Sequence, residues 1–463
     1  MARNYCSTKE IFCNLPEIDN LPEINLKQEE LEYARLCIGA NADTKKGRKK
    51  LNEILYHNKS ILKKIKSMKL YKRIKRMIKG DGRVNILIDN AGFVNKGAEL
   101  MLCAVVEQVR QNIPNHRIVL KHCFYEENVP YCVSKGIVPL KHISKKTLPR
   151  IKHFIVKNLF VKRRYITPSE IDVILDAGGF QFGDQWQDLY KGTSDNSYLK
   201  SYYESFAKLT KKIIFLPQAF GAFEHPISKE RMQIVYQSAT LLYPREQTSF
   251  NYLEALFPNS DKIKLYPDFT CLLKPKVPLV ELLEDNTAVV IVPNQKMITH
   301  SDAETASKYT NFLLEIIQFL QEKNEKIILL NHEGQGDEDI LNEINEKLSA
   351  KLPVLTNLTA LEVKAVIGRA KILISSRFHG VVSGLSQNVP TFCTSWSHKY
   401  QELLKDYQVS DNLLPVADIV EAKTKIEKAL ADLNAYKPKQ DVINNLEQKT
   451  KDMWKEVFET MRK

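Results

Sequence analysis

The sequence predicts an α/β protein built from two doubly wound domains. Short apolar runs alternate with segments of helical period, and the runs are apolar at consecutive positions. The alternation stops at a proline-rich stretch, KPKVP at 274–278, and then restarts. Consecutive apolar positions are typical of parallel strands that helices cover on both faces. A chain of 463 residues is long enough for two separate cores.

The first half of the alternation predicts a parallel sheet between residues 84 and 275. Each run ends in a loop that contains Gly, Pro or Asn, which are the residues that interrupt regular structure. The stretch IKLYPDFTCLL closes this half. Strands are expected at 84–88, 117–120, 171–179, 212–221 and the start of 241–257, and helices at 97–111, 228–241 and the end of 241–257.

The second half predicts another parallel sheet between residues 285 and 416, followed by a charged helical segment at 417–463. Two doubly wound domains joined by a linker are expected to face each other across a cleft, where ligands bind. Strands are expected at 288–294, 326–332, 371–376 and 391–396, and helices at 303–323, 338–348 and 361–369.

Residues 1–83 are expected to form a basic helical extension. Between Lys45 and Arg83 there are sixteen Lys and Arg against two acids, and apolar residues recur at near-helical spacing over 45–80. This segment carries a net charge of +14, against +13 for the whole chain, so the remainder is nearly neutral and no nucleic-acid role is implied. The helix is either a solvated element that packs by one stripe or one that is attracted to an anionic membrane surface.

The composition favours a cytoplasmic protein. No apolar run approaches the roughly 18 residues that a membrane-spanning helix needs, and the first twenty residues show no apolar core of a secretory signal. The eight cysteines are scattered and form no CxxC pair. We therefore expect neither a zinc site nor a disulfide framework, and a reducing compartment.

The stretch ILISSRFHGVVSGL places Ser375, Ser376, Arg377 and His379 in one strand-to-helix turn. Ligands of open α/β sheets bind at the carboxyl ends of strands, and the following helix offers free backbone N–H groups there. An arginine can hold a carboxylate or phosphate with two bonds, and a histidine can exchange a proton near neutral pH. The turn therefore predicts a site for a small anion beside a proton-transfer group. Each residue alone would more often be a core or surface residue.

Polar residues and glycines follow four other expected strands. Carboxamides and carboxylates can hydrogen-bond sugar hydroxyls, glycines let a ligand approach the backbone, and cations can bind phosphate. The alternative for each is an ordinary turn, a helix cap or a surface ion pair. These candidates are Asn90, Asn95 and Glu99 after the first strand, Asp176, Gly178 and Gly179 after the third, and Arg245 and Lys399 after two later strands.

The stretches NKGAE, DAGGF, PQAFG, PRE, YPDF, SSRFHG and HKY occur in this order, and in this order they resemble the polysaccharide pyruvyl transferase family. The resemblance runs from about Val84 to Tyr407. It implies two Rossmann-like domains in a GT-B-like arrangement with the active site between them. It also implies transfer of a pyruvyl group from phosphoenolpyruvate to two hydroxyls of one sugar in a polysaccharide or lipid-linked glycan, which forms a cyclic ketal.

The resemblance also implies roles for individual residues. Arg377 and His379 correspond to the catalytic, donor-site arginine and histidine of the family, and Arg245 to an arginine that faces the donor from the first domain. With Ser375, Ser376 and Lys399 they would bind phosphoenolpyruvate as co-substrate, without a metal or other cofactor. Asn90, Asn95, Glu99, Asp176, Gly178 and Gly179 would lie on the acceptor side.

Two positions depart from the family pattern. Ala98 stands where many members have Asp, and Glu246 follows Arg245 where Asp is frequent. Two other functions stay open at this point. One is a GT-B glycosyltransferase that uses a nucleotide sugar, although no acidic ribose partner is evident. The other is a non-catalytic glycan-binding protein of the same fold. The location at the inner face of the plasma membrane is likewise an expectation.

Overall fold

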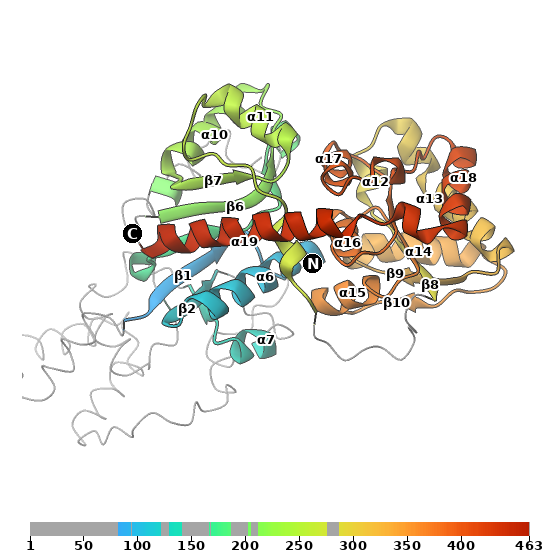
Figure 1. Cartoon of the computed structure of the whole chain (residues 1–463), viewed down its shortest axis with the longest axis horizontal. Coiled ribbons are helices and arrows are strands. Elements are labelled where there is room, and N and C mark those ends of the chain that lie inside the picture. The colour runs from blue at the N-terminus through green and yellow to red at the C-terminus, as the bar shows by residue number, and fades with distance from the viewer. Residues whose placement is uncertain are drawn as a thin grey trace, which may run out of the picture.

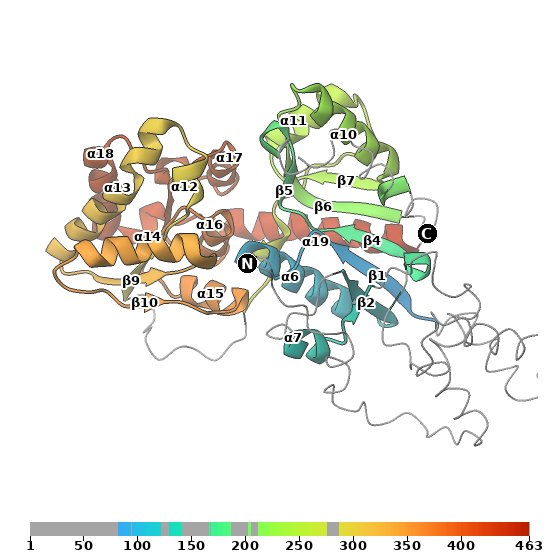
Figure 2. The same ribbon diagram turned by 180° about the vertical axis from the view of Figure 1, so that it is seen from behind.

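The computed structural model describes residues 82–93, 95–121, 129–140, 166, 168–186, 202–204, 212–275 and 287–462. The strands of these residues form two parallel sheets with flanking helices, as Figure 1 shows from one side and Figure 2 from behind. The predicted α/β class is therefore confirmed. The basic helix expected at 45–80 lies outside the described residues.

The first sheet has the strand order β3-β2-β1-β4-β6-β5, with β7 paired to β6, and all of these pairs are parallel. Each strand comes from one of the apolar runs or from the segment between two of them. The elements of this half are β1 (Val84–Asp89), α6 (Lys96–Asn112), β2 (His116–Leu120), α7 (Val129–Ser134), β3 (Val138–Pro139), η2 (Pro168–Glu170), β4 (Val173–Asp176), β5 (Phe180–Phe182), β6 (Lys212–Phe220), α10 (Pro226–Ser238), β7 (Leu241–Pro244), α11 (Gln247–Leu256) and η4 (Phe269–Leu272).

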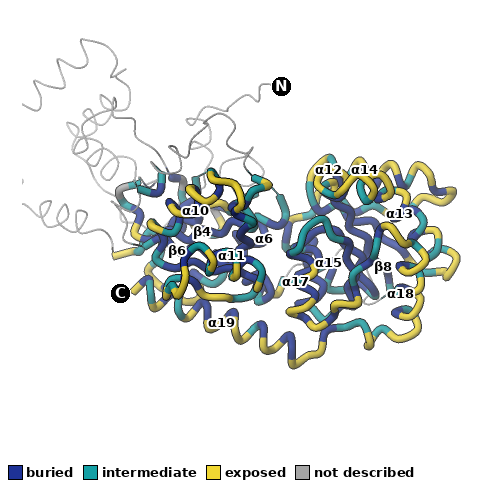
Figure 3. The backbone as a smooth tube through the Cα atoms, turned by 90° about the horizontal axis from the view of Figure 1, so that it is seen from above, coloured by how far each residue is buried: buried dark blue, intermediate teal, exposed yellow. Residues whose placement is uncertain are grey.

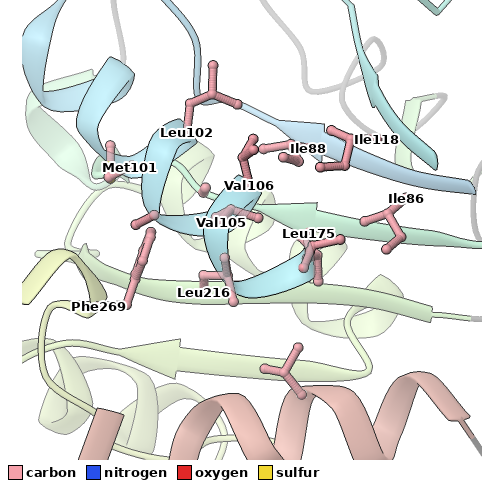
Figure 4. Close-up of a cluster of buried hydrophobic side chains, with 14 of the residues drawn as sticks. Ile86, Ile88, Met101, Leu102, Val105, Val106, Ile118, Leu175, Leu216 and Phe269 are labelled. Atoms are coloured by element: carbon pink, nitrogen blue, oxygen red, sulfur yellow. The ribbon is translucent and has the colours of Figure 1, made fainter. Parts of the chain in front are cut away.

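Both faces of this sheet are buried, which explains its consecutive apolar residues. Ile86 and Ile88 of β1 pack into the cluster under α6, whereas Leu87 between them packs into the cluster on the opposite face. Figure 4 shows the first cluster, with Val105 and Val106 of α6 above the sheet. At about 25 cal/mol per Å² of apolar area, such burial is the main source of stability.

The second sheet has the order β10-β9-β8-β11-β12 and is also parallel throughout. Helix α13 covers one face, and α15 covers the other. The elements of this half are β8 (Ala288–Val292), α12 (Lys296–Thr299), α13 (Ala303–Glu322), β9 (Lys326–Leu330), α14 (Gly334–Lys347), β10 (Val354–Leu355), α15 (Ala360–Ile367), β11 (Ile372–Ser375), α16 (Phe378–Leu385), β12 (Thr391–Cys393), α17 (Lys399–Asp406), η5 (Ser410–Asn412), α18 (Ile419–Ala431) and η6 (Leu433–Tyr436).

The last helix, α19 (Gln440–Arg462), connects the two domains. Its first turns bury Val442 and Leu446 against α16 and α17 of the second domain. Its later turns bury Trp454 and Phe458 in the α6 cluster of the first domain. Figure 3 shows buried and exposed residues alternating along this helix. The helix therefore fixes the two sheets relative to each other and so shapes the space between them.

Several strands end earlier than the sequence indicated. The run at 171–179 gives a strand only to Asp176, because the backbone of Ala177 still bonds to Asp89 while Gly178 and Gly179 turn the chain toward β5. The run at 326–332 likewise ends at Leu330. Residues just beyond a strand are left at the sheet's carboxyl edge, so these early ends place polar side chains between the domains.

Candidate active site

The predicted strand-to-helix turn is present, since β11 ends at Ser375 and α16 begins at Phe378. Ser375 Oγ accepts a hydrogen bond of 3.1 Å from the backbone N–H of Arg377. Ser376 Oγ accepts one of 2.6 Å from the hydroxyl of Tyr309 on α13. Both serines are buried and hold the turn together. Neither lies on the wall of the cavity between the domains, so the structure does not place them against a ligand there.

A cavity of about 300 Å³ lies between the domains, at the carboxyl ends of strands from both sheets. This volume is at the lower end of the range for small-molecule sites. The loops after β1 and β4 form one wall, and the loops after β8, β9, β11 and β12 form the other. The predicted residues that line it are Asn90, Asn95, Gly178, Gly179, Arg245, Arg377, His379 and Lys399.

His379 reaches from the second domain into the loops of the first. Its Nε2 lies 3.5 Å from Asp268 Oδ2. Its Nδ1 faces Gly97 so closely that a Cβ there would come within 2.5 Å of it. The side chain is 11% exposed. Burial lowers the pKa of His379, although Asp268 acts in the opposite direction, so the imidazole is neutral at pH 7. A neutral imidazole with one nitrogen beside a cavity suits a general base.

Asp268 connects His379 to Arg245. Its Oδ1 accepts from the backbone N–H of Thr270 at 3.0 Å, and its Oδ2 lies 3.3 Å from Arg245 Nη1. Burial raises the pKa of Asp268, but its interactions with His379 and with the charged Arg245 outweigh burial and hold that pKa well below the usual range. Arg245 also lies over the ring of Phe378, 3.8 Å from the ring centre. The carboxylate therefore orients a histidine and an arginine from two domains.

Arg377 is bound by carboxylates of α14 and the residue before it. Its Nε donates to Asp337 Oδ2 at 2.7 Å, and its Nη2 pairs with the other oxygen of the same carboxylate. Its Nη1 pairs with Glu333. Burial lowers the pKa of Arg377 to about 10, so the guanidinium stays charged at neutral pH. The side chain also lines the cavity. Burial raises the pKa of Asp337 to about 8, although its two bonds to the Arg377 cation favour the ionised form.

Two lysines line the cavity without such partners. Within the described residues, neither Lys296 nor Lys399 forms an ion pair or a side-chain hydrogen bond. Both lie against Trp396, with their Nζ atoms 5.3 Å and 4.2 Å from its ring centre. Burial, followed by the charges of neighbouring cations, lowers the pKa of both. Lys296 also lies 4.9 Å from the ring centre of Trp186, across the cavity in the first domain.

The structure does not bring Asp176 or Glu99 to the cavity wall. Asp176 is fully buried and accepts from Asn90 Nδ2 and Gln181 Nε2, both at 2.7 Å. Burial and the nearby charge of Asp89 raise the pKa of Asp176 to about 6. Asp176 therefore holds in place Asn90 and Gln181, which both line the cavity. The expectation that its carboxylate contacts an acceptor directly is not supported by this placement.

Glu99 connects the domains. Its Oε1 accepts from the backbone N–H of Ala360, the first residue of α15, at 3.1 Å. Its Oε2 pairs with Lys96 at 2.9 Å. A carboxylate at a helix N-terminus is favoured by the free N–H groups there. The carboxylate of Glu99, for which the resemblance implies a place on the acceptor side, therefore binds the second domain and lies off the cavity wall.

Sequence reasoning missed several residues of the site. Asp268 lies in the stretch YPDF, and it follows no strand end that would mark it as a site residue. His332 follows β9 and lines the cavity, is buried, and has no partner for Nδ1 among the described residues. The third missed residue is Lys296, which follows β8 and lines the cavity. His332 and Lys296 both lie just beyond the end of a strand, and this position could have indicated them from the sequence.

Two other kinds of site are absent from the part of the chain that the structure describes. No group of three or more His, Cys, Asp or Glu side chains there could hold a metal ion. No helix there is both long enough and apolar enough to cross a bilayer.

Two Rossmann-like domains in a GT-B-like arrangement, with a cation-lined cavity between them, define the class of protein. Solved structures share this fold. Anabaena HepE in complex with UDP and glucose aligns with a TM-score of 0.51 at 10% identity, over 82% of this chain and 100% of its own. The UDP-GlcNAc 2-epimerase of Methanocaldococcus jannaschii aligns with a TM-score of 0.52 at 11% identity, over 81% and 99%.

The family is defined by sequence. The profile of the polysaccharide pyruvyl transferase family matches residues 95–398, about two thirds of the chain. The chain therefore belongs to the polysaccharide pyruvyl transferase family, as the motifs had indicated. A search of curated proteins found no significant match. The matched region contains all three of Arg245, Arg377 and His379.

Proposed function

We propose that the protein transfers a pyruvyl group from phosphoenolpyruvate to two hydroxyls of one sugar in a polysaccharide or lipid-linked glycan, and releases phosphate. The observation that carries this proposal is the placement of His379 between Asp268 and a cavity lined by cations. Phosphoenolpyruvate brings a carboxylate and a phosphate, which such a cavity can hold. Family membership supports the transferase class.

In the first step, a sugar hydroxyl adds to the central carbon of the donor. A carbon–oxygen bond forms, and the double bond to the methylene carbon takes up a proton to become a methyl group. An Nε2–H of His379 facing Asp268 leaves the lone pair of Nδ1 free for the hydroxyl proton. The imidazolium that forms is stabilised by Asp268, and it returns the proton to the methylene carbon.

In the second step, the bond between the central carbon and the phosphate oxygen breaks, and the second hydroxyl bonds to the same carbon. Its proton leaves with the phosphate, so the products are the ketal and inorganic phosphate. Arg377, fixed by Asp337, is oriented to hold the donor carboxylate through both steps. Preorganised cations stabilise charge as it develops without reorganising at that moment.

The acceptor side is formed by aromatic and amide side chains. The cavity wall includes Phe180 and Trp186 of the first domain, Trp396 of the second, and the amides of Asn90 and Asn95. Flat apolar faces and amides suit the two surfaces of a sugar ring. A sugar placed between them would present its hydroxyls toward His379.

The experiment is mass spectrometry of an acceptor panel incubated with the full chain and phosphoenolpyruvate. We expect a product heavier by one pyruvyl group with loss of water, and an equal amount of released phosphate. His379→Ala and Arg377→Ala should each abolish both signals while the circular dichroism spectrum stays unchanged. Undiminished turnover in either variant would refute the role given to that residue.

A nucleotide-sugar glycosyltransferase is the competing function, because Anabaena HepE binds UDP in the same fold. A thermal shift separates the two. A ligand at one hundred times its Kd stabilises the folded state by about 2.7 kcal/mol. We expect this shift with phosphoenolpyruvate and none with UDP. The opposite result would favour the glycosyltransferase.

We further propose that the basic segment 45–80 brings the protein to an anionic membrane surface at the inner face of the plasma membrane, where lipid-linked acceptors lie. Its net charge supports this, at about 1 kcal/mol for each cation near such a surface. The full chain should sediment with phosphatidylserine vesicles at low salt but not at high salt. A variant with Lys63, Lys64, Lys66 and Lys69 changed to Glu should stay in solution. Equal sedimentation of both proteins would end this proposal.

A further inference from the structure

Lys364 is a fully buried lysine at the contact between the two domains, on α15 of the second domain. Its Nζ donates to the backbone oxygen of Thr270 in η4 of the first domain at 3.0 Å, and to Ser386 Oγ of the second domain at 3.2 Å. No carboxylate among the described residues pairs with this ammonium. Because a buried charge without such a partner is unfavourable, stability alone does not account for a lysine at this position.

The two elements that Lys364 joins carry the carboxylate and the imidazole of the proposed reaction. Asp268 is the N-cap of η4, and its Oδ1 accepts from the backbone N–H of Thr270 at 3.0 Å and from the hydroxyl of Thr270 at 2.5 Å. His379 is the second residue of α16, and Ser386 is the C-cap of the same helix. Lys364 therefore bonds these two elements to each other, in addition to the contact between Asp268 and His379.

We infer that Lys364 is a positioning residue, which holds Asp268 against the imidazole of His379 by joining η4 of one domain to α16 of the other. This inference rests on the proposed function, because it gives the lysine a part in proton transfer by His379. Asp268 Oδ2 lies 3.5 Å from His379 Nε2, which is already longer than an ordinary hydrogen bond, so a small displacement of η4 would end the contact. Lys364 lies off the cavity wall and so acts through these two residues.

The rest of α15 supports the same arrangement. The backbone N–H of its first residue, Ala360, binds Glu99 Oε1 of α6 at 3.1 Å, and α6 also carries Gly97, which faces the imidazole. The backbone oxygen of Lys364 accepts from Gln387 Nε2, just after α16, at 2.9 Å. Helix α15 is thus bonded to α6, to η4 and to the end of α16, the three elements that place His379.

The charge of Lys364 reduces stability, which favours a role in positioning. Burial lowers the pKa of Lys364 to about 8, and the neighbouring cation of Lys274 acts in the same direction. Cys271, Asp268 and Glu447 act in the opposite direction. Since this pKa is below the ordinary value for lysine, the folded state binds the proton less tightly than the unfolded state, and the charge destabilises the fold at neutral pH. An apolar side chain would avoid this cost but would bond to neither acceptor.

The test is a double-mutant cycle of Lys364→Met with Asp268→Asn, measured as kcat for phosphate release. We expect Lys364→Met alone to lower kcat by about tenfold or more through displacement of the reacting groups, with KM for phosphoenolpyruvate unchanged. In the Asp268→Asn background the same change should lower kcat by no more than about twofold, because the charge that Lys364 positions is already removed. Equal losses in the two backgrounds, or no loss in either, would overturn the inference.

A second readout does not require activity. The nitrogen-15 chemical shifts of the His379 imidazole, assigned by their loss in His379→Ala, show which ring nitrogen carries the proton. Because Nε2 faces Asp268, the unaltered protein should hold the proton at Nε2. Lys364→Met should transfer a measurable fraction of it to Nδ1, and an unchanged tautomer would contradict the positioning role.

Lys212→Met is the matched control. Lys212 also donates to a backbone oxygen of another element, that of Met461 in α19 at 2.9 Å, but it begins β6 at the edge of the sheet opposite the cavity. This variant should change neither kcat nor the tautomer of His379. If circular dichroism shows that Lys364→Met does not fold, Ser386→Ala takes its place, because it removes the acceptor on α16 and should change the tautomer in the same direction.

These outcomes separate the positioning role from the proposed function. If the unaltered protein forms no ketal, the proposed function fails, and the tautomer of His379 still tests the link from Lys364. If it forms the ketal while Lys364→Met leaves kcat and the tautomer unchanged, only the role of Lys364 fails.

Discussion

Gly97 provides a sharp test of the position assigned to His379. It is the second residue of α6, and its missing side chain leaves space for the imidazole. In a Gly97→Ala variant the new Cβ would come within 2.5 Å of His379 Nδ1 and 3.3 Å of its Cε1. Real Cβ contacts are essentially never below 3.0 Å, so the ring must move by at least 0.5 Å. Asp268 and Gly179 contain the ring on its other sides.

The magnitude follows from this displacement. A reacting group misplaced by about 1 Å can lose roughly 100-fold in rate, so a shift of half that size or more predicts a loss on the order of 10- to 100-fold in kcat/KM. This corresponds to about 1.4 to 2.7 kcal/mol of transition-state stabilisation. Alanine is favoured over glycine in a helix by about 0.5–1 kcal/mol. We therefore expect the free energy of unfolding to change much less than the activity.

The assay measures phosphate release with saturating acceptor, together with urea unfolding of each variant. Gly92→Ala is the matched control in the loop before α6, because its Cβ would meet nothing within 4 Å. It should keep activity within about threefold, a change below 1 kcal/mol. Activity of Gly97→Ala near that of the control would refute the placement of His379 as the group that exchanges protons with the substrate.

Three further predictions follow from the site and its support. Asp268→Asn removes the negative charge that faces His379 and Arg245, so we expect kcat to fall by about 100-fold or more. The acidic limb of the pH–rate profile should be displaced, and KM for the acceptor should not change. A pH–rate profile that keeps its shape would show that Asp268 has only a structural role. Burial lowers the pKa of both His332 and His379, so the unfolded state binds more protons than the folded state below about pH 6.5. The free energy of unfolding therefore falls as the pH drops, by at most about 1.4 kcal/mol per histidine and pH unit. A His332→Gln variant should lose less melting temperature on acidification than the unaltered protein, and an identical pH dependence would contradict this prediction. Trp454→Ala leaves a cavity where α19 packs into the core of the first domain. It should lower the free energy of unfolding, measured by urea titration, by about 3–5 kcal/mol. A loss below about 1 kcal/mol would show that α19 does not stabilise the arrangement of the two domains.

The sheets could be predicted because their signal is local. Ile86, Leu87 and Ile88 pack on alternate faces of one strand, and a run without polar residues is what a sheet covered on both sides requires. The early end of β4 was not evident, because Ala177 is apolar like the strand before it. Only the tertiary pairing shows that its N–H bonds to Asp89 while the glycines turn away.

The path of α19 could not be read from its sequence. Its helical period and apolar stripe are clear, but a stripe does not say which surfaces cover it. Val442 is buried in the second domain and Trp454 in the first, and each would suit a core of either. The helix position therefore depends on the shape that two separately formed domains present together.

Polar residues after strand ends were the least certain part of the prediction, since a strand end gives a location and not a partner. Asn90 and Asp176 both follow strand ends, yet Asn90 lines the cavity and Asp176 lies beneath it as its hydrogen-bond acceptor. The sheet order causes this difference, because it places β1 beside β4 and so brings Asn90 within hydrogen-bond distance of Asp176. The local sequence does not indicate that these two strands will be neighbours.

The same reasoning explains why the cations of the cavity differ in kind although the sequence shows them alike. Arg377 and Lys399 both follow strands of the second sheet, but α14 lies beside the first and brings Asp337 to it, while aromatic rings surround the second. A guanidinium with carboxylate partners is held in one orientation, whereas burial without a carboxylate partner lowers the pKa of the Lys399 ammonium well below its usual value. The electrostatic difference between these two cations therefore arises from which elements the fold packs beside each strand end.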